Sequence, residues 1–336
     1  MNGSKPRLNW HPVQHPIINS IWVLEGVSLV VTNTLLAATI LRHAALRTRK
    51  EYAVIGGLAL ADMCMGWAVT LQGATNLRAM VTKSALKPFS RFDCLTKVHA
   101  VLFTFGQSVQ GYMLVVVSTD RLIALAQPLL YFGLDSTYSS GVVGGSFALT
   151  VVQTAVMYLL SWGGQTQIFT RPFCVPAFGL SRQCWAFWNY SHIMLGLTSV
   201  LLFGLVMVAY QLQMNKTMPA GLNENHKKQI KRQRKVTISL GISCLFTLLF
   251  FVLPRIGSTF AVLFNFRKKG FFLGAYAAVF YNLNPILNLF IYLKRHREVR
   301  VGLSALFKNE TLPDDLQSVI TKPIKNNKQR DNVQLF

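Results

Sequence analysis

The chain has 336 residues, of which 51% are hydrophobic and only 14% are charged. A soluble domain typically carries about 25% charged residues, so this deficit indicates that lipid surrounds much of the chain. The formal net charge of +22 would suit a nucleic-acid-binding protein. However, the basic residues lie between long apolar runs and form no stripe on a soluble fold, which excludes nucleic acid as the partner.

Seven apolar stretches follow one another along the chain. They lie at roughly 17–41, 53–76, 98–125, 141–162, 188–212, 236–264 and 271–293. Each is long enough for a helix across about 30 Å of hydrocarbon, which takes about 20 residues. The stretches are continuous and lack the two-residue alternation of barrel strands. We therefore predict an all-α membrane protein whose residues 17–293 form a seven-transmembrane helix bundle.

The segments that flank this bundle are polar. Residues 1–16 are predicted to form an extracellular N-terminal tail, and residues 308–336 a disordered cytoplasmic tail. Between them, "LKRHREVRVGLSALF" places cations on a short amphipathic helix at 294–307. Such a helix lies at the membrane surface and gains about 1 kcal/mol per basic residue from anionic lipid.

The distribution of Lys and Arg predicts the orientation. The segments on the C-terminal side of the predicted bundle carry 21 basic residues and those on the N-terminal side carry 12. Because basic residues concentrate in cytoplasmic segments, the N-terminus is expected outside. Cys94, Cys174 and Cys184 then face the oxidising side, where a disulfide can persist.

Several polar side chains lie inside the predicted spans. Placing a polar group in hydrocarbon costs free energy, so each of them is a candidate functional residue. They are Asn33, Asp62, Gln107, Gln110 and Asn284. Asp62 is the costliest, because a buried carboxylate must find hydrogen-bond donors or become protonated. Asn33 and Asn284 are its expected donors. The cluster can hold helices together, take part in a switch, or do both.

Charge and proline mark three spans further along. Asp120 and Arg121, in "STDRLIALAQP", follow directly on the apolar run "GYMLVVVS". Pro254 and Pro285 each remove a backbone donor and predict kinks in the sixth and seventh spans. The inner ends of these spans could then swing as semi-rigid levers.

Seven features recur in a fixed order: Asn33, Asp62 at the end of "LALAD", Cys94, Asp120-Arg121, Tyr210, Pro254 and "NP" at 284–285. Over residues 17–307 this order resembles the rhodopsin-like (class A) G-protein-coupled receptors. The segments "LRTRKEYAVIGGLALAD" and "FCVPA" further resemble nematode serpentine chemoreceptors of the Srsx class. The resemblance implies a chemosensory receptor of the cell membrane. It would convert binding of an extracellular ligand into activation of a heterotrimeric G protein through outward movement of helix 6.

The resemblance also implies residue roles. Asp120 restrains Arg121 in the resting receptor, and Arg121 extends toward Tyr210 and the inserted G-protein helix after activation. Asp62, Asn33 and Asn284 form a polar core that repacks on switching, and Pro285 and Tyr292 belong to the switch. Tyr292 lies one helical turn beyond Asn288, which stands where the family has tyrosine, and shares its face.

Cys94 is implied to pair with Cys174 in "FCVPA", with Cys184 as the alternative partner. Gln110 and Phe280 replace the small polar residues beside the family's sodium ion, which argues against a sodium site at Asp62. The run "KKQIKRQRK" at 227–235 contains no acid that could also hold Arg121. We therefore expect Asp120 to restrain Arg121 almost alone and basal signalling to be appreciable.

The ligand side is less defined. Residues 98–110 contain no carboxylate to anchor a monoamine, and residues 271–293 contain no Lys for a retinal Schiff base. Arg255 either meets an acidic or polar ligand group, or reaches the interface or a neighbouring side chain. The residues expected to line the site are Gln72, Phe103, Gln107, His192, Arg255 and Tyr276. A small molecule or a peptide would fit, and no cofactor is implied.

Other classes of membrane protein fit less well. A transporter or a ligand-gated channel of seven helices is the alternative. Seven spans do not divide into two inverted halves, and neither a charged pore ring nor a filter loop is evident. An enzyme would need a nucleophile, a paired base or a metal-spaced cluster, and the chain shows none.

Overall fold

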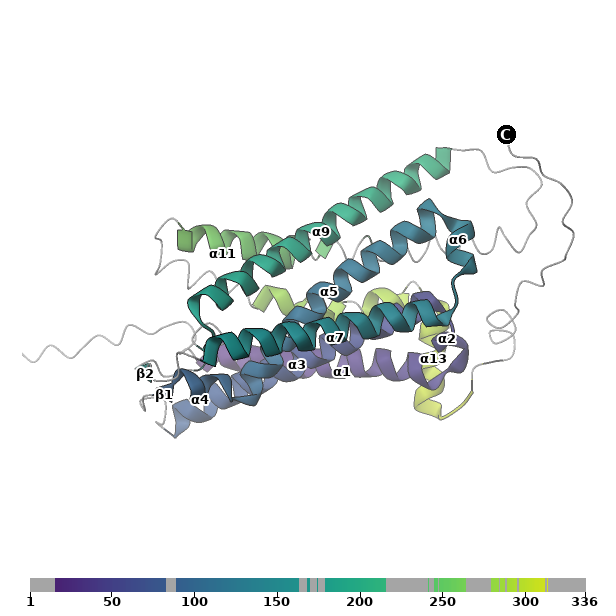
Figure 1. The fold of residues 1–336 in the computed structure, drawn as a ribbon. Coiled ribbons are helices and arrows are strands. Elements are labelled where there is room, and N and C mark those ends of the chain that lie inside the picture. Colours follow the sequence, from purple (N-terminus) through teal and green to yellow (C-terminus); the bar gives the residue numbers. More distant parts are fainter. Residues whose placement is uncertain are drawn as a thin grey trace, which may run out of the picture.

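The computed structural model describes residues 16–82, 89–162, 168–169, 174, 179–215, 241, 245–246, 248–263, 279–283, 285–287, 289–294, 296–311 and 313. Five of its helices are long and apolar enough to cross a membrane. They are α1 (Pro16–Arg42), α3 (Lys50–Val81), α5 (Val98–Ala126), α7 (Ser136–Ser161) and α9 (Arg182–Asn215). They run alongside one another and form an elongated bundle (Figure 1).

Shorter elements gather at the two ends of this bundle (Figure 1). One end holds α4 (Arg91–Leu95) and the strand pair β1 (Phe89–Ser90) and β2 (Ile168–Phe169). The other holds α2 (Ala44–Arg47), α6 (Pro128–Gly133) and α13 (Arg297–Lys308). The bundle therefore has two different ends, with the long helices between them.

The first five predicted spans are confirmed as helices. Most are longer than the apolar stretch that predicted them: α3 begins at Lys50 and α9 at Arg182. The reason is that hydropathy ends where charged residues begin, whereas the backbone hydrogen bonds of the helix continue through them. The sixth and seventh predicted spans lie partly outside the described residues, as do most of the predicted tails.

The sixth predicted span contains two kinds of helix. A π-helical segment, η4 (Leu248–Val252), leads directly into α11 (Leu253–Leu263), which contains Pro254. Proline removes one helical hydrogen bond, and π-segments accommodate such a break locally. Residues 279–283, 285–287 and 289–294 are also helical and belong to the seventh predicted span.

Glycines allow close approach of three neighbouring helices. A Cβ atom added at Gly66 of α3 would lie 2.8 Å from the Cβ of Leu29 in α1. One added at Gly106 of α5 would lie 3.0 Å from the backbone nitrogen of Met65. Small residues at helix contacts are the usual means of close packing in membrane proteins. The α1, α3 and α5 helices are therefore packed backbone to backbone.

Helix α13 crosses the end of the bundle beside α2 (Figure 1). It begins at Arg297 because His296 is in an extended conformation, and it ends at Asn309, which has a left-handed φ of 54°. Its Val299 and Ala305 are buried, whereas Phe307 is 71% exposed. His43 contacts the Gly302 carbonyl at 3.0 Å and joins this helix to the end of α1.

A disulfide joins Cys94 to Cys174, with their Cα atoms 5.3 Å apart, and confirms the predicted pair. Cys184, the alternative partner, is a buried free thiol in α9. The bond lies beside the antiparallel pair in which Phe89 opposes Phe169. Helix α4, which precedes α5, is thus covalently tied to the segment between α7 and α9.

Candidate functional site

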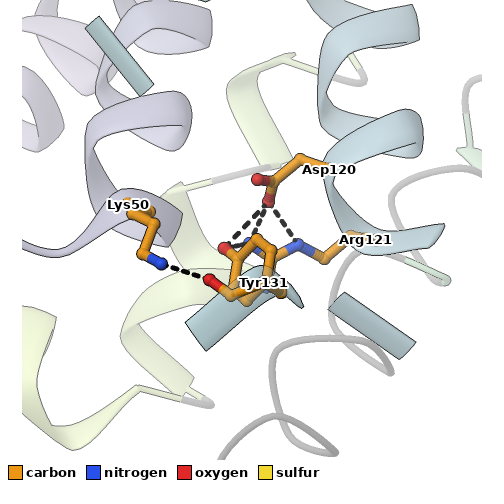
Figure 2. Close-up of polar contacts among 4 residues, drawn as sticks. All are labelled: Lys50, Asp120, Arg121 and Tyr131. Atoms are coloured by element: carbon orange, nitrogen blue, oxygen red, sulfur yellow. Dashed lines mark hydrogen bonds and ion pairs between the residues drawn. The ribbon is translucent and has the colours of Figure 1, made fainter. Parts of the chain in front are cut away.

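The Arg121 cluster, made of Lys50, Asp120, Arg121 and Tyr131, lies where α5 ends and α6 begins (Figure 2). Asp120 and Arg121 are almost fully buried. The Nε of Arg121 donates to Asp120 Oδ2 at 3.0 Å, and its Nη2 contacts the same oxygen. The Tyr131 hydroxyl also donates to that oxygen, at 3.4 Å, and accepts from Arg121 Nη2 at 3.2 Å. The same carboxylate oxygen of Asp120 therefore accepts hydrogen bonds from both the Arg121 guanidinium and the Tyr131 phenol.

The local chain path explains this arrangement. Pro128 begins α6 in the first helical turn, where proline costs no hydrogen bond. The short helix α6 then places Tyr131 next to the end of α5. Lys50, at the start of α3, donates to the Tyr131 carbonyl, and its Nζ lies 4.7 Å from the ring centroid. A cation over an aromatic face is attractive, so Lys50 fastens α6 to α3.

Burial sets the electrostatics of the cluster. An ion pair taken out of water is stable only if further hydrogen bonds compensate its desolvation. The Tyr131 hydroxyl supplies such bonds to both charges. Burial raises the pKa of this phenol above its ordinary value, so it stays protonated and able to donate.

Tyr131 contacts both Asp120 and Arg121, and the expectation that Asp120 restrains Arg121 almost alone did not include this residue. Residues 127–134, which contain Tyr131, carry no charge, and no role was predicted for them from the sequence. A signal was nevertheless present. Tyr131 follows Pro128 within a short apolar segment, "PLLYFG", and a buried tyrosine usually finds a partner for its hydroxyl.

The Asp62 carboxylate accepts a hydrogen bond from Gln110 Nε2 at 2.6 Å. The expected donor Asn33 is buried, but its amide donates to the Leu29 carbonyl of its own helix at 3.0 Å. The assignment of Asn33 as the donor is corrected accordingly, because the longer Gln110 side chain reaches Asp62 from α5. Asn284 lies outside the described residues.

A second buried carboxylate, that of Glu25, lies in α1 and was not predicted as a functional residue from the sequence. Glu25 Oε2 accepts from Asn282 Nδ2 at 2.9 Å, and both residues are buried. In the same helix Asn19 accepts from Asn76 of α3 at 2.8 Å. The rule that singled out Asp62, a carboxylate inside an apolar span, also applies to Glu25. These contacts join α1 to α3 and to the helical segment 279–283.

The Arg255 cluster, made of Trp188, Asn189, His192 and Arg255, lies between α9 and α11. Arg255 is only 6% exposed, so it does not reach the interface. Its Nε donates to Asn189 Oδ1 at 2.9 Å, and its Cζ lies 5.1 Å from the Trp188 ring. The His192 ring lies 4.6 Å from that of Trp188, and its Nδ1 bonds the Trp188 carbonyl at 2.5 Å.

The structure brings several predicted ligand residues to this cluster and leaves others apart. The ring of Phe103 lies 6.2 Å from Trp188, and the main chain of Gln107 lies beside His192. Gln72 is buried in α3. Tyr276 lies outside the described residues. Trp188, which the sequence analysis did not select, is the centre of the cluster.

Two of the remaining predicted switch residues, Tyr210 and Tyr292, lie in the apolar core at the Arg121 end of the bundle. Tyr210 of α9 is half-buried and packs against the large apolar core there. Tyr292 is buried in the same core, with its ring 5.9 Å from that of His296. Pro285 lies in the helical segment 285–287. Among the residues that the structure describes, no group of His, Cys, Asp or Glu could hold a metal ion.

Known receptors are similar to this chain. Cannabinoid receptor 1 of Xenopus laevis is 24% identical over 88% of the chain, which spans 64% of that receptor. Olfactory receptor 4X1 of Homo sapiens is 24% identical over 65% of the chain and 71% of its own length. Olfactory receptor 2A7 of Mus musculus is 25% identical over 77% of the chain and 80% of its own length.

A family model matches residues 27–307, which is most of the chain and includes every helix described above from the middle of α1 to α13. Its members are seven-transmembrane proteins of the cell membrane, and the five long apolar helices agree with that architecture. The chain belongs to the serpentine type 7TM GPCR chemoreceptor Srsx family.

Proposed function

We propose that the protein is a chemosensory receptor that binds an extracellular ligand near the Arg255 cluster and activates a heterotrimeric G protein at the Arg121 cluster. The Arg121 cluster is the observation that carries this proposal. Its ion pair is buried at the end of the bundle and is held by contacts that can be exchanged. A buried pair of this kind is better suited to a switch than to plain stability, since apolar residues would stabilise as well.

The two clusters lie toward opposite ends of α5. Gln107 lies beside His192, and Arg121 follows fourteen residues later in the same helix. At 1.5 Å per residue they are roughly 21 Å apart. Ligand contacts at one end would bias the switch at the other through the helices that join them.

The sixth span supplies the moving part of the proposed mechanism. Its π-helical segment and Pro254 lie between the Arg255 cluster and the inner part of that span. Phe250 of this segment stacks on Phe280 of the seventh span, with centroids 6.2 Å apart. A ligand that shifts Arg255 would turn the helix at this break, open the bundle and let Arg121 leave Asp120 for the G protein.

The proposed orientation places the N-terminus outside the cell. The Cys94–Cys174 disulfide supports it, because disulfides persist in oxidising compartments. Helix α13 would then lie at the cytoplasmic membrane surface. Its Arg297, Arg300 and Lys308 suit contact with anionic lipid, while its exposed Phe307 suits the headgroup boundary.

Guanine-nucleotide exchange in membranes tests the function. The full chain is expressed with a promiscuous Gα subunit, and GTP-analogue binding is measured against a panel of volatile, small polar and peptide ligands. We expect at least one ligand to stimulate exchange in the wild type and not in Arg121→Ala at equal surface expression. Ligand-dependent current or flux in the absence of G protein would instead establish a channel or a transporter.

A further inference from the structure

The two oxygens of the Asp120 carboxylate differ in their contacts. Oδ2 accepts hydrogen bonds from Arg121 and Tyr131, whereas Oδ1 has no hydrogen-bond partner among the residues that the structure describes. The side chain is fully buried, at 0% exposed. If activation takes Arg121 away, the phenol of Tyr131 is the contact that remains to Oδ2. A buried charge without a counter-ion is strongly disfavoured, so the active state needs another cation beside Asp120.

Lys50 is a second cation at this site. It approaches Tyr131 from α3, while Asp120 and Arg121 approach the same residue from α5 (Figure 2). Its Nζ donates to the Tyr131 carbonyl and lies 4.7 Å from the centroid of the ring. Lys50 and Asp120 also attract each other electrostatically. Because the ammonium group is carried on a flexible four-carbon chain, it can move toward Asp120 once Arg121 has left.

The other carboxylates that attract Lys50 have partners of their own. They are Glu51 and Asp135. Glu51 lies 4.0 Å from Arg49, and Asp135 caps α7 by accepting from the Thr137 backbone nitrogen at 3.1 Å. Asp135 is also exposed, and Glu51 is only partly buried, so water screens their charges. Neither carboxylate needs Lys50 as much as a buried Asp120 without Arg121 would.

Resting on the proposed receptor function, we propose that Lys50 replaces Arg121 as the counter-ion of Asp120 in the active state. In the resting state Lys50 holds the Tyr131 carbonyl. When Arg121 leaves for the G protein, the Lys50 ammonium moves toward Asp120 and donates to its carboxylate. Lys50 is then a positioning residue that stabilises the active state, and the buried charge of Asp120 is compensated on both sides of the transition.

A purely structural role of Lys50 predicts the opposite sign. If Lys50 only fastened α6 to α3, its removal would loosen Tyr131 and raise basal nucleotide exchange. In the resting state, however, Lys50 is only partly buried, so water weakens its contacts. Asp120 is fully buried, and water does not take the place of its counter-ion. Loss of Lys50 should therefore disfavour the active state more than the resting state.

The test measures ligand-free binding of a GTP analogue to a promiscuous Gα, with the full chain in membranes at matched surface expression. Lys50→Met keeps the length of the side chain and removes its charge. Nucleotide exchange should fall at least about 10-fold, because the active state then contains an uncompensated buried carboxylate. Lys50→Arg should retain most of the exchange. Arg47→Met, which removes an exposed cation three residues earlier, should behave as the wild type does.

Two further backgrounds make the result specific. Tyr131→Phe removes one contact of the resting state but keeps the ring and the carbonyl that Lys50 contacts, so a fall can be measured from a higher level. In Asp120→Asn there is no charge to compensate, so adding Lys50→Met should leave nucleotide exchange unchanged. A general loss of folding would lower exchange equally in every background.

Several outcomes would overturn the proposal. One is nucleotide exchange in Lys50→Met equal to or above that of the wild type. The others are an equal fall in the Asp120→Asn background and a Lys50→Arg variant as inactive as Lys50→Met. Each of these leaves the receptor function intact. Absence of nucleotide exchange in the wild type, Tyr131→Phe and Asp120→Asn alike would instead contradict the receptor function itself.

Discussion

Tyr131 is a third partner of the Asp120–Arg121 pair. Typical energies of the two kinds of contact show which of them restrains Arg121 more strongly. Removing one member of a buried ion pair costs about 3–5 kcal/mol, because the other charge stays buried. A neutral hydrogen bond contributes only about 0.5–1.5 kcal/mol. Asp120 therefore supplies most of the restraint on Arg121, and the Tyr131 hydroxyl adjusts it.

Replacement of Tyr131 by Phe removes only this hydroxyl. The ring and its contact with Lys50 remain, so α6 should keep its place. Because the lost hydrogen bonds stabilise the resting arrangement, we expect basal G-protein exchange to rise about 2- to 10-fold. Exchange is measured at matched surface expression, with Tyr190→Phe on the exposed face of α9 as the control. Unchanged basal exchange would show that Tyr131 does not hold the switch.

Combining Tyr131→Phe with Asp120→Asn adds a further check. Both substitutions act on contacts to the same oxygen, Asp120 Oδ2, so their effects should not add. The double variant should have nearly the basal exchange of Asp120→Asn alone. Fully multiplicative effects would mean that Tyr131 acts through some other contact.

Gln110 provides a second residue-scale prediction. Its amide donates to the Asp62 carboxylate, which is buried within the bundle. Gln110→Leu removes this donor while keeping most of the side-chain volume. We expect the free energy of unfolding to fall by about 2–3 kcal/mol, because a buried carboxylate loses a hydrogen bond. Thermal unfolding of the purified receptor in detergent measures it, with exposed Gln211→Leu as the control. Equal melting temperatures for the two variants would contradict this role.

At the scale of elements, the contact between Glu25 of α1 and Asn282 matters most. It joins the first helix to the seventh predicted span just before Pro285. The carboxylate can be replaced by an amide oxygen without losing the acceptor, because Asn282 donates to it. The contact should therefore depend on a hydrogen-bond acceptor at this position and not on charge.

Glu25→Gln is accordingly expected to preserve stability, and Glu25→Leu to lower it by about 1–3 kcal/mol, because the buried hydrogen bond from Asn282 to this position is lost. Surface expression and the melting temperature in detergent are the measurements. Leu24→Ala, at a neighbouring position that is 69% exposed, is the matched control. Similar losses in Glu25→Gln and Glu25→Leu would show that the charge itself is required.

An element can be predicted from the sequence when the interactions that form it are local in the sequence. Long spans such as α5 are visible in the sequence, because lipid requires an unbroken apolar run. Asp120 and Arg121 are visible because charge is rare beside such a run. The π-helical segment before Pro254 is not visible in the sequence, since its hydrogen-bond register depends on neighbouring helices. Contacts made in space, such as Tyr131 with Asp120 or Gln110 with Asp62, likewise require the fold.

For the whole molecule, the question is how the Arg255 cluster would act on the Arg121 cluster. Helix α5 runs between them and is packed closely on α3 through Gly106. The Cys94–Cys174 disulfide anchors α4, which directly precedes α5. A helix held in this way changes position little, so the more mobile element should be the sixth span, which has a π-segment and a proline. The two clusters would then be coupled through α11 and its contacts with α9.

Coupling of this kind is reciprocal, and that yields a prediction about affinity. If a ligand favours the state in which Arg121 has left Asp120, then any change that favours this state must tighten ligand binding by the same factor. Asp120→Asn weakens the restraint about 21 Å from Gln107, by helix geometry, and touches no residue of the Arg255 cluster. We expect it to raise agonist affinity about 5- to 50-fold, which lies within the usual range of allosteric coupling.

Binding of an agonist found in the ligand panel is measured in membranes without G protein, at matched receptor density. Tyr190→Phe, which alters neither cluster, should bind as the wild type does. Tyr131→Phe should lie between the wild type and Asp120→Asn, because it removes the weaker of the two restraints. If Asp120→Asn raises basal exchange but leaves affinity unchanged, the two clusters are not coupled. The Arg255 cluster would then be a structural contact between α9 and α11, and the ligand would act elsewhere.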